Sequence, residues 1–291
     1  MSKPLFIRAS ERLFGITARR MFGQQLVLLD YPVRPVPRYG HGKPPHPILH
    51  EIINRNRSLY EDTFKEFLNY RGHLLGIPAK EPDTPQGPCW LNEFFSGLDA
   101  VALYSFLCMK NPARYFEIGS GWSTRFARKA IADHKLQTKI KSFDPSPRTD
   151  ISQVCDDVVR KSVEDLEAGA FDELEPGDIL FVDGSHRCFM NSDVTCVFLD
   201  ILPRLKEGVL VQFHDILLPY DYHPQWAERY YSEQYLLAVH LLAETRKFDI
   251  ILPNAFVTYD QALSGVLRPL SDELRARGVE MKGCSFWIQI R

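Results

Sequence analysis

The residues best placed to do chemistry lie in the segment 115–124. Short apolar residues lead to an acid, Glu117, and two glycines with one residue between them, Gly119 and Gly121, follow it. A helical pattern begins directly afterwards, over 125–134. Open α/β sheets use a strand, a tight turn and a helix in this order to bind a nucleotide-like ligand at the carboxyl ends of their strands. The segment therefore predicts a ligand of that kind.

A third glycine would mark this turn as a dinucleotide site, because glycines let the backbone approach a pyrophosphate. Thr124 occupies that position, which argues against a nicotinamide-dependent oxidoreductase. A second acid, Asp144, ends the next predicted strand, where a carboxylate can accept hydrogen bonds from both ribose hydroxyls. Its alternative role is to cap the turn before Pro145.

Two later segments place polar side chains directly after buried strands. Asp183 and His186 follow one apolar run, and His214 and Asp215 end the next. A histidine titrates near neutrality, so His186 could accept a proton from a hydroxyl; otherwise it caps a helix or bonds the backbone. Neighbouring side chains of a strand point to opposite faces, so His214 and Asp215 converge only if the chain bends there.

The elements that must position these residues alternate between helix and strand. Continuous apolar runs such as 178–182 are typical of strands buried on both faces. The alternation predicts an α/β fold, a Rossmann-like and mostly parallel sheet with helices on both faces. The predicted strands are 114–118, 139–143, 158–161, 178–182, 208–213, 248–252 and 284–290. The predicted helices are 47–75, 92–110, 123–134, 191–205 and 232–244.

The chain divides into two predicted parts. Residues 1–88 form an N-terminal arm and a helical appendage or cap, and residues 89–291 form the α/β domain. The basic stretch 1–23 is either an organelle targeting segment or an amphipathic helix that packs on the body or on a partner subunit. Because a helical arm often serves dimers, a homodimer stays open.

The composition is ordinary for a globular protein, with 45% hydrophobic and 25% charged residues. A net charge of −2 lacks the strongly basic character of a nucleic-acid-binding domain. No apolar run approaches the roughly 20 residues of a membrane-spanning helix. The six cysteines show no C-x-x-C spacing, which predicts reduced thiols in a cytoplasmic protein. Neither nucleic acid nor a membrane is therefore expected as a partner.

Four motifs occur in order, each at the end of a predicted strand: Glu-Ile-Gly-Ser-Gly-x-Ser-Thr, Phe-Asp-Pro-Ser, Val-Asp-Gly-Ser-His and Val-Gln-Phe-His-Asp. Over residues 92–291 the chain resembles class I S-adenosylmethionine-dependent methyltransferases. More narrowly, it resembles the bacterial branch that includes macrolide-sugar O-methyltransferases. The resemblance implies a seven-stranded sheet whose last strand is antiparallel, and S-adenosylmethionine as the cofactor. This cofactor has no phosphate, which agrees with the absence of a third glycine.

The resemblance also implies roles for the site residues. The ribose would be held by Asp144, the adenine would lie near Ser162, and Asp183 would complete the cofactor site. Those expected around the methionine end of the cofactor are Glu117, Gly119, Ser120, Gly121 and Ser123.

In the macrolide-sugar enzymes an Asp-x-x-His supplies a metal ligand and a general base, which implies these roles for Asp183 and His186. Asp215 matches a second metal ligand of that branch, whereas His214 departs from it. Imidazole suits Mn, Fe or Zn better than Mg. Three possibilities stay open: another divalent metal bound by Asp183, His214 and Asp215, a metal that His214 does not touch, or no metal.

These expectations combine into an S-adenosylmethionine-dependent O-methyltransferase. Its acceptor would be a hydroxyl of a small molecule such as a sugar or polyketide, approached by the aromatic residues of 216–233. The alternative is a binding or assembly protein that keeps the methyltransferase fold without catalysis, which the departure at His214 favours.

Overall fold

The structure, a computed structural model, describes residues 33–95, 97–148, 150–167, 169–243 and 247–291, and residues 10, 13, 27, 29 and 31. The chain forms two compact units, Met1–Val36 and Pro37–Arg291. The sheet and the helices with the bounds given below all lie in the second unit. The predicted basic segment 1–23 lies outside the described residues, apart from Ser10 and Leu13.

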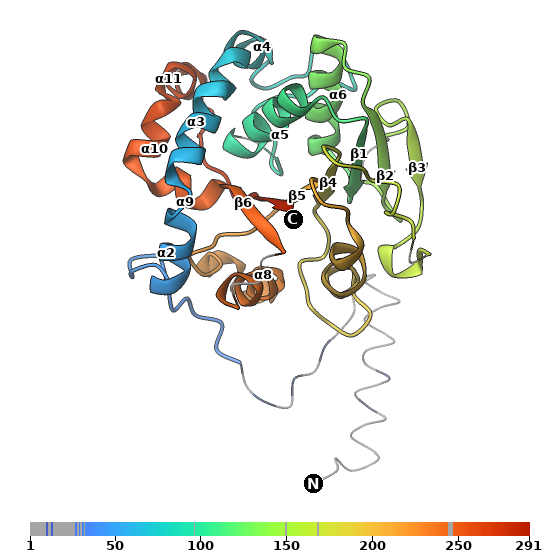
Figure 1. The fold of residues 1–291 in the computed structure, drawn as a ribbon, viewed down its shortest axis with the longest axis vertical. Coiled ribbons are helices and arrows are strands. Elements are labelled where there is room, and N and C mark those ends of the chain that lie inside the picture. The colour runs from blue at the N-terminus through green and yellow to red at the C-terminus, as the bar shows by residue number, and fades with distance from the viewer. Residues whose placement is uncertain are drawn as a thin grey trace. The chain divides into compact units, whose positions relative to one another are not determined.

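One mixed sheet of seven strands runs through the unit in the order β3-β2-β1-β4-β5-β7-β6 (Figure 1). Neighbouring strands from β3 to β5 pair in parallel, and β7 pairs antiparallel with both β5 and β6. The prediction of a mostly parallel, Rossmann-like sheet with an antiparallel last strand is confirmed. The strands are β1 (Arg114–Ile118), β2 (Lys139–Phe143), β3 (Asp157–Val159), β4 (Ile179–Val182), β5 (Leu210–Phe213), β6 (Phe248–Pro253) and β7 (Phe286–Ile290).

The three central parallel strands end in register. Ile118 pairs with Val182, and Val182 pairs with Phe213. Every residue of β4 and β5 is buried, as expected for strands covered on both faces. The backbone continues this pairing by one residue, because the Asp183 amide donates to Ile118 and the His214 amide donates to Val182. The first residues after these strands therefore meet at one edge of the sheet.

Helices cover both faces of this sheet. Figure 1 shows α5 and α6 on one side and α8 on the other. The α-helices are α2 (Pro47–Asn54), α3 (Arg57–Phe67), α4 (Arg71–Gly76), α5 (Gly97–Lys110), α6 (Trp122–His134), α7 (Asp193–Cys196), α8 (Glu233–Leu242), α9 (Asn254–Tyr259), α10 (Gln261–Val266) and α11 (Arg268–Ala276). Shorter turns are η1 (Leu68–Tyr70), η2 (Val163–Asp165), η3 (Val197–Ile201), η4 (Leu202–Arg204) and η5 (Pro224–Arg229).

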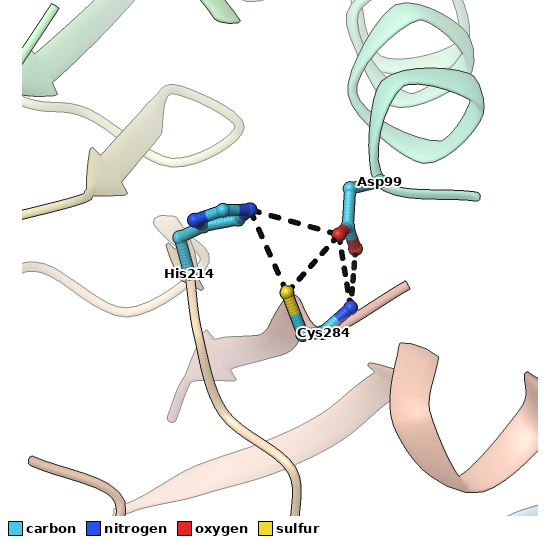
Figure 2. A group of neighbouring side chains, drawn as sticks. All are labelled: Asp99, His214 and Cys284. Carbon is cyan, nitrogen blue, oxygen red and sulfur yellow. Dashed lines mark hydrogen bonds and ion pairs between the residues drawn. The ribbon is translucent and has the colours of Figure 1, made fainter. Parts of the chain in front are cut away.

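A single acid interrupts the buried, largely apolar helix α5. Asp99 lies in its first turn with only 4% of its surface exposed. Its carboxylate accepts the backbone amides of Cys284 and Ser285 at 2.8–3.0 Å and the side-chain amide of Asn254 at 2.8 Å. Figure 2 shows Asp99 facing Cys284 and the His214 ring. The beginning of α5 is thereby joined to the segment that leads into β7.

The predicted single helix over 47–75 is wrong, because the structure divides it into α2, α3, η1 and α4. The first break lies before Asn56, whose side-chain amide donates to the carbonyl of Ile250 on β6 at 3.0 Å. A contact with a strand far along the chain thus ends a helix that local periodicity would continue.

The predicted helix 92–110 begins later than expected, at Gly97. The Asn92 side chain bonds the carbonyls of Cys89 and Phe95 at 2.6–2.8 Å and accepts from the Phe95 amide at 2.7 Å. These bonds hold a turn in place of the first helical turn, since asparagine side chains compete with the helix for backbone partners. The predicted helix 191–205 is also irregular and consists of α7, the π-helical η3 and the 3-10 turn η4.

Residues 254–276 contain three helices, α9 to α11, that were not predicted. In the described part of the chain, no helix has the length and apolar character needed to cross a membrane. The predicted boundary between residues 88 and 89 stays a prediction.

Candidate active site

The turn after β1 brings two strand ends into direct contact. Gly119 adopts φ +80°, and a Cβ atom at this position would lie 2.1 Å from the carbonyl oxygen of Asp183. Only glycine combines this backbone conformation with so close an approach. A Cβ atom at Gly121 would meet no atom of the described residues within 4 Å. The first glycine is therefore required by the fold, whereas the second leaves space beside the turn.

Glu117, the one acid in β1, is fully buried, and its carboxylate points at hydroxyl groups. Its carboxylate accepts hydrogen bonds from Ser123, from Thr124 at 2.5 Å and from the Tyr115 phenol at 3.2 Å. Burial raises the pKa of Glu117 to about 8, and these three bonds only partly oppose that rise. The structure thus places Glu117 and Ser123 as partners of each other inside the turn.

Asp144 follows β2 and lies half-buried next to the same turn. One of its carboxylate oxygens accepts the amide and the hydroxyl of Ser120 at 3.0 and 2.7 Å, and the other accepts the Ser146 amide at 2.8 Å. Ser162 precedes η2, which follows β3. Asp144 therefore lies directly after β2 and Ser162 shortly after β3, as predicted for cofactor residues. Asp144 also caps its own turn.

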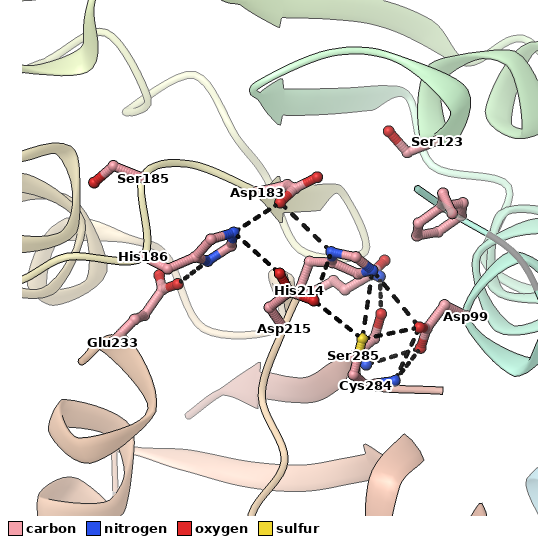
Figure 3. Close-up of polar contacts among 12 residues, drawn as sticks. Asp99, Ser123, Asp183, Ser185, His186, His214, Asp215, Glu233, Cys284 and Ser285 are labelled. Atoms are coloured by element: carbon pink, nitrogen blue, oxygen red, sulfur yellow. Dashed lines mark hydrogen bonds and ion pairs between the residues drawn. The ribbon is translucent and has the colours of Figure 1, made fainter. Parts of the chain in front are cut away.

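The ends of β4 and β5 gather the other predicted site residues (Figure 3). Nε2 of His186 lies 3.2 Å from Asp183 and 3.5 Å from Asp215. Nδ1 of His214 lies 3.5 Å from Asp183 and 3.6 Å from Asp215. Asp215 has φ +54°, which supplies the bend that brings its carboxylate back towards His214. Two imidazoles thus face the same two carboxylates.

His186 is held from behind by a residue that the sequence analysis did not single out, Glu233. Nδ1 of His186 lies 2.8 Å from the Glu233 carboxylate, and both side chains are buried. The Glu233 and Ser232 amides donate to the His186 carbonyl at 3.2 and 2.8 Å, so backbone and side chain fix the ring together. Glu233 thereby leaves Nε2 as the ring nitrogen that faces the strand ends.

The charges in this group shift the pKa values of His186 and Asp183 in opposite directions. Burial alone would lower the pKa of His186, but Asp183 and Glu233 outweigh it and raise the pKa well above its ordinary value. Burial would raise the pKa of Asp183, but His214 and His186 reverse the direction and lower it. Among Asp183, His186 and His214, Asp183 is the most exposed, with 36% of its side-chain surface accessible. The charged group therefore opens towards solvent at Asp183.

The aromatic segment 216–233 approaches this group, although only part of it is available to a ligand. The Tyr231 ring lies 4.6 Å from the His186 ring, and the Arg187 and Arg229 guanidinium groups lie over it at 5.4 and 5.6 Å. Tyr222 is buried, and its hydroxyl accepts the Gln234 amide. Tyr222 is therefore structural, whereas Tyr231 borders the site.

Three residues of the group were missed by sequence reasoning: Asp99, Glu233 and Cys284. A lone acid in an otherwise apolar helix was a usable signal for Asp99, and an acid directly after the aromatic segment was one for Glu233. Cys284 gave no signal, because the six cysteines show no common spacing. All six are free thiols.

The predicted metal ligands Asp183, His214 and Asp215 meet only some of the requirements of a metal site. In the part of the chain that the structure describes, the buried Nδ1 of His214 has no hydrogen-bond partner, which suits a ligand atom. However, Mg²⁺ prefers oxygen ligands, and an imidazole at the centre of the set fits it poorly. Among the described residues, only Asp99, His214 and Cys284 bring three ligand atoms within 4.8 Å of one another. The predicted set stays a prediction.

Comparison with known proteins places a named domain on this part of the chain. A family described as a methyltransferase domain matches residues 116–216. No curated protein sequence matches the chain.

Solved structures with similarity include a SAH-bound methyltransferase from Podospora anserina, with 13% identity and a TM-score of 0.41 over 100% of this chain and 99% of that one. An O-methyltransferase from Bacillus cereus in complex with SAH has 11% identity and a TM-score of 0.39, over 79% and 90%. The MycE methyltransferase of the mycinamycin pathway, in complex with Mg, SAH and mycinamycin VI, has 16% identity and a TM-score of 0.35, over 62% and 45%. At such values none of the three informs the function of this chain.

The matched residues run from β1 to the end of β5 and hold Glu117, Asp144, Asp183, His186 and His214. Over residues 116–216 this chain is therefore similar to a methyltransferase domain.

Proposed function

We propose that the protein is an S-adenosylmethionine-dependent O-methyltransferase that acts on a hydroxyl group of a small molecule, such as a sugar or a polyketide. One observation carries this proposal. Beside the segment that matches a methyltransferase domain, the buried Glu233 holds Nδ1 of His186 at 2.8 Å and leaves Nε2 next to two acids at the strand ends. This is the arrangement of a histidine that takes a proton from a hydroxyl.

The cofactor, when bound, supplies a methyl group already activated by its sulfonium. The turn of Gly119, Ser120 and Gly121 would hold it, with Asp144 for the ribose and Ser162 near the adenine. The open space at Gly121 and the half-buried carboxylate of Asp144 support this placement. Asp183 would face the same space from β4.

The acceptor hydroxyl must become nucleophilic, and the residues of this chain can achieve that. Nε2 of His186 takes the hydroxyl proton, while Glu233 accepts the Nδ1 hydrogen and keeps the ring in the required tautomer. The carboxylates of Asp183 and Asp215 stabilise the imidazolium that forms. Asp183 and Glu233 raise the pKa of His186, so neutral His186 becomes abundant only at a higher pH than an ordinary histidine requires.

Calorimetry and kinetics test the two halves of the proposal. Titration with S-adenosylmethionine and S-adenosylhomocysteine should give 1:1 binding, and its absence would refute the cofactor assignment. His186→Ala should lower turnover by about 10²–10⁴-fold, the usual contribution of a general base, with cofactor affinity nearly unchanged. A variant with full activity would remove His186 from the mechanism.

A second candidate is a protein that binds the cofactor without catalysis. The raised pKa of His186 favours it, because a protonated imidazole cannot accept a proton. Stoichiometric cofactor binding without methyl transfer to a broad panel of hydroxyl compounds, at neutral and alkaline pH, would support this candidate. A cytoplasmic location and a homodimer stay predictions.

A further inference from the structure

The His214 ring also borders a cluster outside the proposed reaction. Its Nε2 atom lies 3.6 Å from Oδ2 of Asp99 and 3.7 Å from Sγ of Cys284, and Sγ lies 3.4 Å from the same Oδ2 (Figure 2). The N···O separation is longer than the 2.7–3.2 Å or so of a hydrogen bond. Three donor atoms of different chemistry thus form a nearly equal-sided triangle.

These separations match the edges of a tetrahedral zinc site. Zinc lies about 2.0–2.2 Å from imidazole nitrogen and carboxylate oxygen and about 2.3 Å from thiolate sulfur. At tetrahedral angles, such bonds put the ligand atoms about 3.3–3.6 Å from one another. The observed triangle has edges of 3.4, 3.6 and 3.7 Å. A single ion can therefore reach all three atoms with little movement.

The Asp99 carboxylate is oriented for such a role. Its Oδ1 atom accepts hydrogen bonds from the amides of Cys284 and Ser285 and from the Asn254 side chain. Its Oδ2 atom faces Sγ and the imidazole and, among the described residues, accepts hydrogen bonds from the Cys284 amide at 2.9 Å and from the thiol. One oxygen is thus held by the fold, and the other points into the triangle.

Nδ1, the ring nitrogen of His214 that points away from the triangle, lies near two carboxylates. A metal-bound histidine almost always donates its other ring N–H to a carboxylate or carbonyl, which fixes the tautomer. Nδ1 has no hydrogen-bond partner among the described residues and lies 3.5 Å from Asp183 and 3.6 Å from Asp215. A small rotation of either carboxylate would let it accept the Nδ1 hydrogen while Nε2 binds the ion.

We propose that Asp99, His214 and Cys284 form a zinc site that joins α5, β5 and the segment before β7. Thiolate and imidazole ligands select zinc over magnesium. Binding displaces the thiol proton of Cys284 to solvent, so the carboxylate and the thiolate together balance the charge of Zn²⁺. Asp215, whose Oδ1 atom lies 3.3 Å from Sγ, is a candidate fourth donor. The site does not depend on the proposed methyl transfer.

The test uses the full chain, stripped with a chelator and reloaded with Zn²⁺ or Co²⁺. Metal analysis should find one zinc per chain, and Co²⁺ should produce a thiolate-to-cobalt absorption band in the near ultraviolet. Wild-type protein that binds no zinc, or that binds cobalt without this band, would overturn the proposal. The cobalt spectrum needs no variant and decides the matter even if substitutions impair folding.

Three variants locate the ion. Cys284→Ser should lose the band and stoichiometric zinc, whereas Cys196→Ser, which changes a partly buried cysteine on α7, should keep both. Asp183→Asn should keep the band, with zinc affinity weakened by at most about 10–100-fold as for an outer partner of a ligand histidine. Loss of zinc in Asp183→Asn, with full retention in Cys284→Ser, would place the ion on the other side of His214 and refute the proposed site.

Discussion

The ends of β1 and β4 are neighbours at one edge of the sheet, and each carries an acid in a different setting. Glu117 on β1 is surrounded by the hydroxyls of Ser123, Thr124 and Tyr115, and burial raises its pKa to about 8. Asp183, the residue after β4, is partly exposed and faces two imidazoles, which lower its pKa against the opposing effect of desolvation. Neutral hydroxyl partners do not offset the cost of charging the buried Glu117, whereas imidazolium partners keep the partly exposed Asp183 charged.

The two strand ends are consequently suited to different tasks. The β1 end is a rigid turn whose acid is protonated over much of the neutral range. The β4 and β5 ends hold acids and histidines that share protons, which is the property that proton transfer requires. Each of the following experiments tests one side of this comparison.

The largest effect is expected from Gly119→Ala. The new Cβ atom would lie 2.1 Å from the Asp183 carbonyl oxygen, at a backbone φ of +80°. Strain and overpacking together should cost about 3 kcal/mol or more, measured by urea unfolding. Gly121→Ala is the matched control and should leave the unfolding free energy nearly unchanged, because its Cβ atom has open space. Equal destabilisation by both substitutions would contradict the close contact between the strand ends.

A smaller effect is expected from Glu117→Gln, and it should depend on pH. Glu117 has a folded-state pKa of about 8, above its unfolded value, so the folded state binds the extra proton. Wild-type stability therefore falls as the pH rises from the unfolded pKa to about 8 and then levels off with respect to this group. Glutamine mimics the protonated acid, so the variant should gain stability relative to wild type over this interval. Denaturation at pH 5 to 9 measures the difference, and a constant difference would refute the raised pKa.

The smallest effect is expected from Glu233→Gln, in the pH profile of activity. The Glu233 charge contributes to the raised pKa of His186, so its removal should lower that pKa. Since the base acts when neutral, the acidic limb of kcat/KM should move to lower pH, with the plateau little changed. The profile at saturating cofactor measures this shift. An unmoved limb would show that Asp183 alone sets the charge of His186.

Local sequence was sufficient for much of the fold. The predicted strands 114–118 and 139–143 agree with β1 and β2, and the helix 123–134 agrees with α6 to within one residue. Their apolar periodicity is strong and their ends carry turn residues. The predictions failed where distant contacts decide, as at Asn56, which bonds a strand nearly 200 positions away.

The site also contains residues that local sequence predicted and residues that only distant contacts bring in. Asp183, His186, His214 and Asp215 were predicted together because parallel strands in register end at one edge. Asp99, Glu233 and Cys284 come from α5, from α8 and from the segment before β7, and nothing in their neighbourhoods along the chain shows which strand end they approach.

The sequence by itself determined the βαβ turn, the parallel sheet and the residues that follow each strand, because periodicity and turn chemistry are properties of short segments. Only the tertiary structure decided which partner each ionisable group has. That pairing keeps Glu117 protonated, charges Asp183 and His186, and aims the second nitrogen of His214 at a thiol. The pKa of a buried group depends on charges within a few ångströms, and the fold gathers those charges from the whole length of the chain.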